Sequence, residues 1–340
     1  MKPIIAITMG DVCGVGPEIV AKSLTNPELH AYCRPVVVGD ADRLRRSAGI
    51  VGADLAVEPI APDDVASAEP SPEKAVCIDP GLGVGDLPFG VVHPAAGHAA
   101  FEFLRIAVDL AKAGRVAAIV TAPLNKEALH KGGHPYPGHT EILADLTGTR
   151  SYSMMLVTPK LKVIHLTTHV GLIDAVRRIT PERTYEVVRL AHETVRRTGT
   201  KTPRIAVCGI NPHAGENGLF GFGEEAEKLV PGIARARGEG IDVSGPWPAD
   251  TVFYRAMRGE FDVVVACYHD QGHIPVKLMS IDDGVNVTVG LNGGVIRTSV
   301  DHGTAFDIAG KNLANEQSLL AAARFAVDLL PDTPEPGSGG

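Results

Sequence analysis

The sequence predicts an α/β protein built on a mainly parallel sheet with helical crossovers. Short β-branched apolar runs, such as Val263 to Ala266, alternate along the chain with longer amphipathic segments. Several of these runs end abruptly in polar residues and glycine, as buried strands do where a sheet edge binds a ligand. A chain of 340 residues exceeds what one core usually holds, so two domains are expected.

The composition is that of a globular enzyme. The chain is 44% apolar and 21% charged, with a formal charge of −8, which argues against non-specific binding to nucleic acid or to an anionic membrane. Its five cysteines form no CxxC pair and are odd in number, so reduced thiols and a cytoplasmic location are expected. No signal-peptide pattern and no apolar run of about 18 residues is present, so no membrane partner is expected.

The first half shows three strands and two helices. We expect strands at 4–8, 35–39 and 116–120, and a loop at 10–16 leading into a helix with Pro17 at its first position. Residues 54–90 are rich in Pro and Gly and predict short strands at best. A helix is expected over 97–114, because one stripe carries Phe101, Leu104, Val108 and Ala111.

The second half repeats the alternation. Strands are expected at 153–157, 162–167, 204–208, 263–267 and 285–289. Helices are expected from 140, over 180–198 with Thr180 as its cap, and over 223–237, 249–258 and 317–330. The tail at 331–340 is expected to be disordered, because it consists of Pro, Gly and polar residues.

Three histidines follow three of these strands. His169, His213 and His269 each lie one to five residues beyond a buried run. Because the carboxyl ends of parallel strands share one edge, these imidazoles together suit a divalent transition metal with positions open for substrate. The alternative is three separate loop histidines with ordinary hydrogen bonds. His165, inside a strand, is expected in the core, and His192 on a solvated helix face.

An anion site is expected where residues 138–141, Gly-His-Thr-Glu, begin a helix with free N–H groups. The alternative is that Thr140 only caps this helix. The glycine-rich stretches at 10–18 and 81–86 match neither GxGxxG nor a P-loop, so a nicotinamide cofactor needs a site of another kind.

Charged and amide residues follow the strand at 263–267. Lys277 and Arg297 could clamp carboxylate and phosphate, with Asn286 nearby, or could be surface charges. Asp250, at a helix start, is either an N-cap or a site carboxylate.

Six motifs occur along the chain: TTHV, CGINPHAGE, GPWPADT, YHDQGHIPVK, GVNVTVGL and IRTSVDHGTAFDIAGK. Together they make the chain resemble the 4-hydroxythreonine-4-phosphate dehydrogenase family of pyridoxal phosphate biosynthesis. The likeness runs from the N-terminal MGD to about Leu330. The segment DHGTAFDIAGK also resembles the cofactor-binding stretch of isocitrate and isopropylmalate dehydrogenases, which bind NAD without a Rossmann loop.

The resemblance implies two α/β/α domains of the isocitrate dehydrogenase type with the active site in the cleft between them. We expect residues 1–131 plus about 300–330 in a discontinuous first domain, and 132–299 in a second that holds most metal and substrate residues. It also implies a homodimer with shared active sites, one metal ligand coming from the partner.

The implied roles fall on these residues. One divalent ion per subunit (Zn, Co, Mn or Mg) is held by His169, His213 and His269. Substrate is bound by His139, Thr140, Lys277, Asn286 and Arg297. NAD or NADP lies near His302, Gly303, Thr304, Ala305 and Asp307.

The expected reaction is NAD-linked oxidation and decarboxylation of a 4-phosphorylated 3-hydroxy acid, with Lys277 and Asp250 as candidates for proton transfer. The substrate is either 4-phosphooxy-threonine or, because GHIPVKL after His269 resembles a catabolic branch, D-threonate or D-erythronate 4-phosphate. Alternatives are a dihydrodiol dicarboxylate dehydrogenase of aromatic degradation and, in a different class, a phosphate acyltransferase of similar fold.

Overall fold

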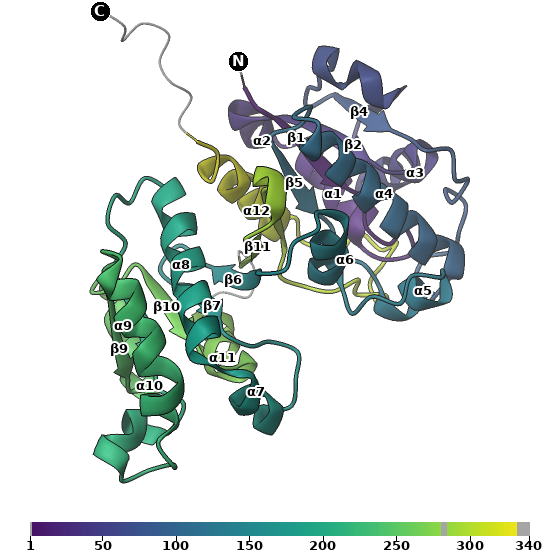
Figure 1. Cartoon of the computed structure of the whole chain (residues 1–340). Coiled ribbons are helices and arrows are strands. Elements are labelled where there is room, and N and C mark those ends of the chain that lie inside the picture. The colour runs from purple at the N-terminus through teal and green to yellow at the C-terminus, as the bar shows by residue number, and fades with distance from the viewer. Residues whose placement is uncertain (1, 280–283, 332–340) are drawn as a thin grey trace, which may run out of the picture.

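The computed structural model describes residues 2–279 and 284–331, and these form one twelve-stranded sheet with helices on both faces (Figure 1). The strand order is β3-β4-β2-β1-β5-β12-β11-β6-β7-β10-β8-β9. The first six strands in this order are parallel to one another. They are β1 (Ile4–Thr8), β2 (Arg34–Val38), β3 (Ala56–Ile60), β4 (Lys74–Ile78), β5 (Ala118–Thr121) and β12 (Arg297–Val300).

The direction of the sheet reverses at its centre. β11 is antiparallel to both β12 and β6, and β6 is antiparallel to β7, after which β7, β10, β8 and β9 run parallel. β11, β7, β10, β8 and β9 therefore run opposite to the first six strands, whereas β6 runs in the same direction as those six. The strands of this second half are β6 (Ser153–Val157), β7 (Lys162–His165), β8 (Ile205–Cys208), β9 (Val243–Trp247), β10 (Val263–Ala266) and β11 (Val285–Val289).

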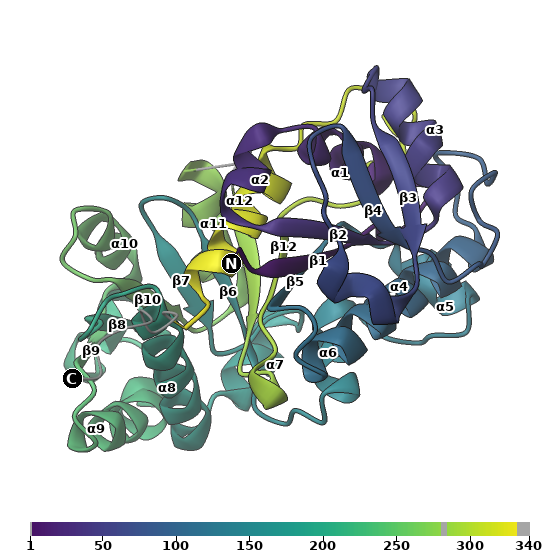
Figure 2. The same cartoon turned by 90° about the horizontal axis from the view of Figure 1, so that it is seen from above.

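The helices of the first half lie on two sides of its strands, with α1 and α3 on one side and α4 on the other (Figure 2). α12 packs on β12, β5 and β11 at the centre, and it also contacts α1. The helices of this half are α1 (Gly16–Leu24), α2 (Pro27–Tyr32), α3 (Ala41–Val51), α4 (Pro94–Lys112), α5 (Lys126–Lys131), α6 (His139–Leu146) and α12 (Gln317–Asp328).

In the second half, α8 packs on β7, β8 and β10, and α11 packs on β6, β7 and β10. The α-helices are α7 (Leu172–Arg178), α8 (Pro181–Arg197), α9 (Val230–Gly238), α10 (Ala249–Met257) and α11 (His269–Met279). Short 3-10 or π turns are η1 (Pro62–Ser67), η2 (Pro212–Gly218), η3 (Glu225–Leu229) and η4 (Asn292–Gly294). No helix within the described ranges is long and apolar enough to cross a bilayer.

The loop after β1 packs closely against the loop after β5. Gly10 has φ +70°, and a Cβ there would lie 2.3 Å from the backbone oxygen of Pro123. Asp11 N–H donates to the same oxygen at 2.9 Å. Glycine is required here because both the backbone conformation and the close approach exclude a side chain.

The predicted fold class is confirmed, and most elements lie where they were expected. The helix expected from 97 begins at Pro94, where proline suits the first turn. Residues 54–90 contain two regular strands, β3 and β4. The expected domain bounds stay a prediction, and the predicted tail lies outside the described residues apart from Pro331.

Candidate active site at the centre of the sheet

A cavity of about 270 Å³ lies where the two halves of the sheet meet. Polar residues of β5, β11 and β12 form its floor, and the start of α6 and the end of β7 supply its walls. Seven of the predicted site residues line it: His139, Thr140, His169, Asn286, Arg297, His302 and Gly303.

Arg297 is a buried cation on this floor. Its side chain donates to Thr121 Oγ1 through Nε and Nη2 (3.2 and 2.6 Å) and to Thr288 Oγ1 through Nη1 (3.0 Å). It is 2% exposed, and burial lowers its pKa to about 9, with Glu141 opposing this effect. Arg297 thus stays charged at pH 7 while its hydrogen-bond partners are neutral hydroxyls. The site therefore suits an anion.

The start of α6 faces the same space. The N-cap is Gly138, which offers no side-chain bond, so the first N–H groups of the helix are uncapped. The alternative that Thr140 caps this helix is wrong, because Thr140 lies inside it and its hydroxyl meets Thr288 Oγ1 at 3.3 Å. Burial first, then the charges of Arg297 and Lys126, hold the pKa of His139 well below its usual range.

Two of the three predicted metal-binding histidines come together. β7, β10 and β8 are parallel neighbours, so the residues after them share one edge as expected. The ring centroids of His169 and His269 are 5.6 Å apart. Burial first, then Lys126 and His269, lowers the pKa of His169, which favours the neutral form that binds metals. The Nδ1 of His269 donates to Asp270 Oδ1 at 2.7 Å, leaving Nε2 free.

His213 lies elsewhere, in the η2 turn. Residues 213–217 all have positive φ, and the Nδ1 of His213 donates to Glu216 Oε2 at 2.6 Å. Its Nε2 is therefore free as well, and its ring lies edge-on to Phe220. Within the ranges that the structure describes, no three His, Cys, Asp or Glu side chains of a single chain are close enough together to hold a metal ion.

The two candidates for proton transfer differ in position. Lys277 Nζ bonds Asp301 through both its carboxylate (2.6 Å) and its backbone oxygen (2.7 Å), and Asp301 lines the cavity. Asp250 is exposed in the first turn of α10, whose N-cap is Pro248. The N-cap interpretation of Asp250 is therefore wrong.

The predicted cofactor segment leaves the carboxyl end of β12. His302 and Gly303 line the cavity, and the Thr304 carbonyl accepts from Val15 N–H at 3.0 Å. Gly14 is needed for this contact, since a Cβ there would lie 2.9 Å from the Thr304 backbone oxygen. Asp307 is exposed, and Ala305 has φ 41°. The segment thus rests on the β1–α1 loop, at an edge where parallel sheets bind ligands.

Comparison with known proteins identifies the family. The model of the family described as Pyridoxal phosphate biosynthetic protein PdxA matches residues 31–326. This chain belongs to the PdxA family.

Individual relatives agree with that assignment. A D-threonate 4-phosphate dehydrogenase of Cupriavidus necator is 56% identical over 96% of this chain and 97% of its own, and one of Bordetella bronchiseptica is 47% identical over 97% and 93%. The crystal structure of a 4-hydroxythreonine-4-phosphate dehydrogenase from Burkholderia phymatum is 55% identical, covers 98% of this chain and 100% of its own, and has a TM-score of 0.87. This PdxA-family chain is accordingly an oxidoreductase acting on a CH–OH group.

The cavity of this PdxA-family chain also contains residues that the sequence analysis missed. Lys126 ends the segment TAPLNK that follows the predicted strand at 116–120, and its position in the loop after a buried strand was the available signal. Thr121, Ser299, Asp301 and His273 also line the cavity. Lys126 begins α5 and adds a second cation beside Arg297.

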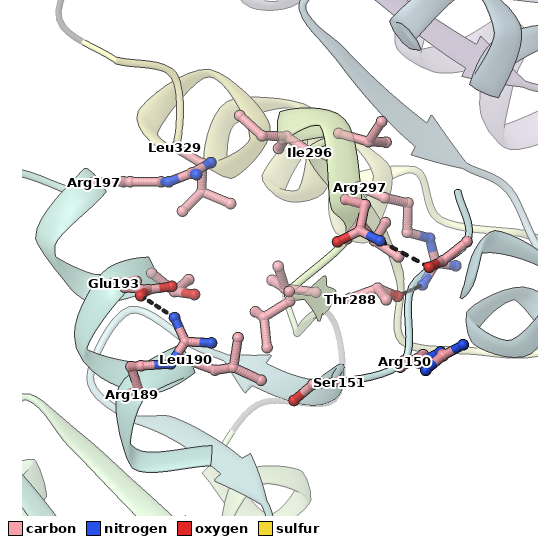
Figure 3. Close-up of a pocket in the computed structure, with 18 residues that line it drawn as sticks. Arg150, Ser151, Arg189, Leu190, Glu193, Arg197, Thr288, Ile296, Arg297 and Leu329 are labelled. Carbon is pink, nitrogen blue, oxygen red and sulfur yellow. Dashed lines mark hydrogen bonds and ion pairs between the residues drawn. The ribbon is translucent and has the colours of Figure 1, made fainter. Parts of the chain in front are cut away.

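A second cavity of about 460 Å³ lies between α8 and the end of α12 (Figure 3). Its lining includes Val287, Thr288 and Val289 of β11, and Arg297 lines both cavities. Arg189 pairs there with Glu193, and Figure 3 shows Arg197 across the cavity from Arg297. This larger cavity of the PdxA-family chain contains no predicted histidine, and the smaller one is the candidate site.

The buried His165 should make the stability of this PdxA-family protein depend on pH. Burial lowers its pKa from 6.5 to about 3, and the side chain is fully buried, as predicted. Below pH 6.5, His165 is protonated in the unfolded chain but stays neutral in the folded protein. The free energy of unfolding therefore falls as the pH drops from 6.5 towards 3, and His165 does not affect it above pH 6.5.

Lowering the pH from 6.5 to 5 should reduce the free energy of unfolding by about 2 kcal/mol through His165 alone. Urea unfolding of wild type and His165→Leu at both pH values measures it. The variant should lose about 2 kcal/mol less than wild type over this range; parallel losses would show that His165 titrates normally.

Proposed function

We propose that this chain is a metal-dependent, NAD-linked dehydrogenase that oxidises and decarboxylates a 4-phosphorylated hydroxy acid. D-threonate 4-phosphate is the first candidate substrate, because relatives at 56% and 47% identity bear that name. The observation that carries the proposal is Arg297, a buried cation whose bonds go to threonine hydroxyls beside an open cavity.

The phosphate occupies the space between Arg297, Lys126 and the start of α6. Arg297 and Lys126 supply charge, the uncapped N–H groups of α6 donate, and neutral His139 donates without adding a further buried charge. Asn286 extends this site along β11. Its Nδ2 contacts Met154 Sδ at 3.1 Å, whereas its buried Oδ1 has no hydrogen-bond partner in the described part of the chain and can accept from a substrate hydroxyl.

The divalent ion is held by His169 and His269 of one chain with His213 of the partner subunit. The donor set fits, because the Nδ1 atoms of His269 and His213 are each held by a carboxylate, which leaves Nε2 as the ligand. When bound, the ion supplies Lewis-acid polarisation of the substrate oxygens during oxidation and loss of CO₂.

A homodimer with shared sites would explain why His213 and Asp250 lie outside the cavity. His213 lies on η2 and Asp250 on α10, two elements that contact each other. The chain just after η2 exposes large apolar side chains, with Phe222 95% exposed and Leu219 71% exposed. Large apolar side chains exposed in this way are typical of a protein interface.

NAD lies along residues 302–307, over the loop between β1 and α1. Lys277, bonded to Asp301 at the cavity wall, is placed to exchange a proton with the substrate once the negative charge of the substrate competes for it. Asp250 of the partner subunit is the second candidate for this proton.

A steady-state assay tests the function. D-threonate, D-erythronate and 4-hydroxythreonine 4-phosphates and a dihydrodiol dicarboxylate are each supplied with NAD or NADP, with NADH and CO₂ measured, before and after dialysis against chelator. D-threonate 4-phosphate should give the highest kcat/KM, and chelation should abolish it until Co²⁺ or Zn²⁺ is restored. Full activity after chelation would exclude the metal role, and oxidation without CO₂ would exclude decarboxylation.

A further inference from the structure

His273 makes two contacts with His269 from one turn further along α11. The two rings are stacked with centroids 3.6 Å apart and planes 11° apart. The Nδ1 of His273 also donates to the backbone oxygen of His269 at 3.0 Å. This bond fixes the ring of His273 by itself, so that the ring offers a rigid flat surface to its neighbour.

A third imidazole stands behind this pair. His165, fully buried in β7, has its ring centroid 4.7 Å from that of His273, and its Nδ1 donates to the Met154 carbonyl at 3.3 Å. Gly272 allows the approach, because a Cβ there would lie 2.4 Å from His165 Nε2. Three imidazole rings therefore lie in contact one after another, from His165 in the core of the sheet through His273 to the proposed metal ligand His269.

The hydrogen bond to Asp270 is not sufficient to hold the imidazole ring of His269 in one orientation. The side chain of Asp270 is 75% exposed, so water competes for its bond to the Nδ1 of His269. The stacked face of His273 is the contact that water cannot replace, because stacked flat rings attract each other beyond the effect of the area that they bury.

We propose that His273 is a positioning residue that fixes the ring plane of His269 and thereby points its Nε2 at a divalent ion. This inference rests on the proposed function, which supplies the ion. His273 is not itself a ligand of that ion, since lone pairs in two nearly parallel planes 3.6 Å apart cannot converge on one atom.

Metal affinity of the full-length protein tests the proposal without an activity assay. Apo wild type, His273→Leu and His273→Phe are titrated with Co²⁺ by calorimetry, and the visible d–d spectrum of each Co²⁺ complex is recorded. Loss of a residue that orients a ligand typically costs 10–100-fold in metal affinity, so the leucine variant should bind at least about tenfold more weakly with an altered spectrum. Phenylalanine keeps the flat stacked face and should recover most of the loss.

The controls separate this inference from the proposed function. His192→Leu changes a half-buried histidine on α8 that does not line the cavity, and this variant should bind Co²⁺ as wild type does. Wild-type affinity and spectrum in His273→Leu, together with weakened binding in His269→Ala, would overturn the inference alone. Equal binding, or none, in wild type and His269→Ala would overturn the metal site and the inference together. Thermal melting checks folding, and if the leucine variant is unfolded, His273→Gln is measured in its place.

Discussion

Replacing Arg297 by methionine should raise the KM for the phosphorylated substrate by about 10³-fold, equivalent to about 4 kcal/mol. The side chain is 2% exposed, and its hydrogen bonds go to the hydroxyls of Thr121 and Thr288. An anion that binds there pairs with a guanidinium that is already desolvated. Removing one member of such a buried charge pair costs about 2–5 kcal/mol of binding free energy. Steady-state kinetics over a wide range of substrate concentrations measures the change.

The same substitution should leave the unliganded protein as stable as before, or more so. A buried guanidinium without a carboxylate bonded to it is costly to desolvate, and an apolar side chain of similar volume is often neutral or stabilising in its place. Urea unfolding in phosphate-free buffer checks this. A lower stability matching the loss of affinity would indicate that Arg297 holds the fold rather than the substrate.

Arg43 provides the matched control. It is also fully buried, but its guanidinium donates to the backbone carbonyls of Val84 and Leu87, and it lines no described cavity. Arg43→Met should leave KM within about twofold and lower the stability by about 1–3 kcal/mol, because those carbonyls lose their donor. If both arginine variants changed KM equally, the anion site would be assigned to the wrong residue.

The sequence predicted the parts of this fold that depend on local pattern. Val263 to Ala266 is apolar and β-branched without interruption, and it is a fully buried strand. The strands before His169 and His213 have the same character and are its two neighbours, so the shared edge after these strands followed from the pattern and the rule for parallel sheets.

Other features depend on long-range packing and left no local signal. β12 lies between β5 and β11, far apart in sequence, and this pairing brings Arg297 against Thr121. α11 begins at His269 and continues through Pro275, although proline normally ends a helix. The left-handed residues 213–217 turn His213 away from the other two histidines, and no propensity predicts such a run for residues other than glycine.

Removing His269 should lower kcat/KM by about 10³-fold, since loss of a metal ligand forfeits several kcal/mol of charge stabilisation in the transition state. His269→Ala leaves His169 as the one proposed ligand from its own chain. His192→Ala, on α8, is the matched control and should stay within about twofold of wild type, because it lines no described cavity. Equal losses in the two variants would refute the assignment of His269.

Mixing two inactive variants tests whether the site is shared. If His213 serves the partner's site, a heterodimer of His213→Ala and His269→Ala contains one site with both defects and one with neither. Random exchange of subunits makes half of the dimers mixed, so an equimolar mixture should recover about a quarter of wild-type activity. If all three histidines served the site of their own chain, every site would carry one defect and mixing would restore nothing. Activity against mixing ratio therefore decides where the third ligand comes from, independently of which hydroxy acid is the substrate.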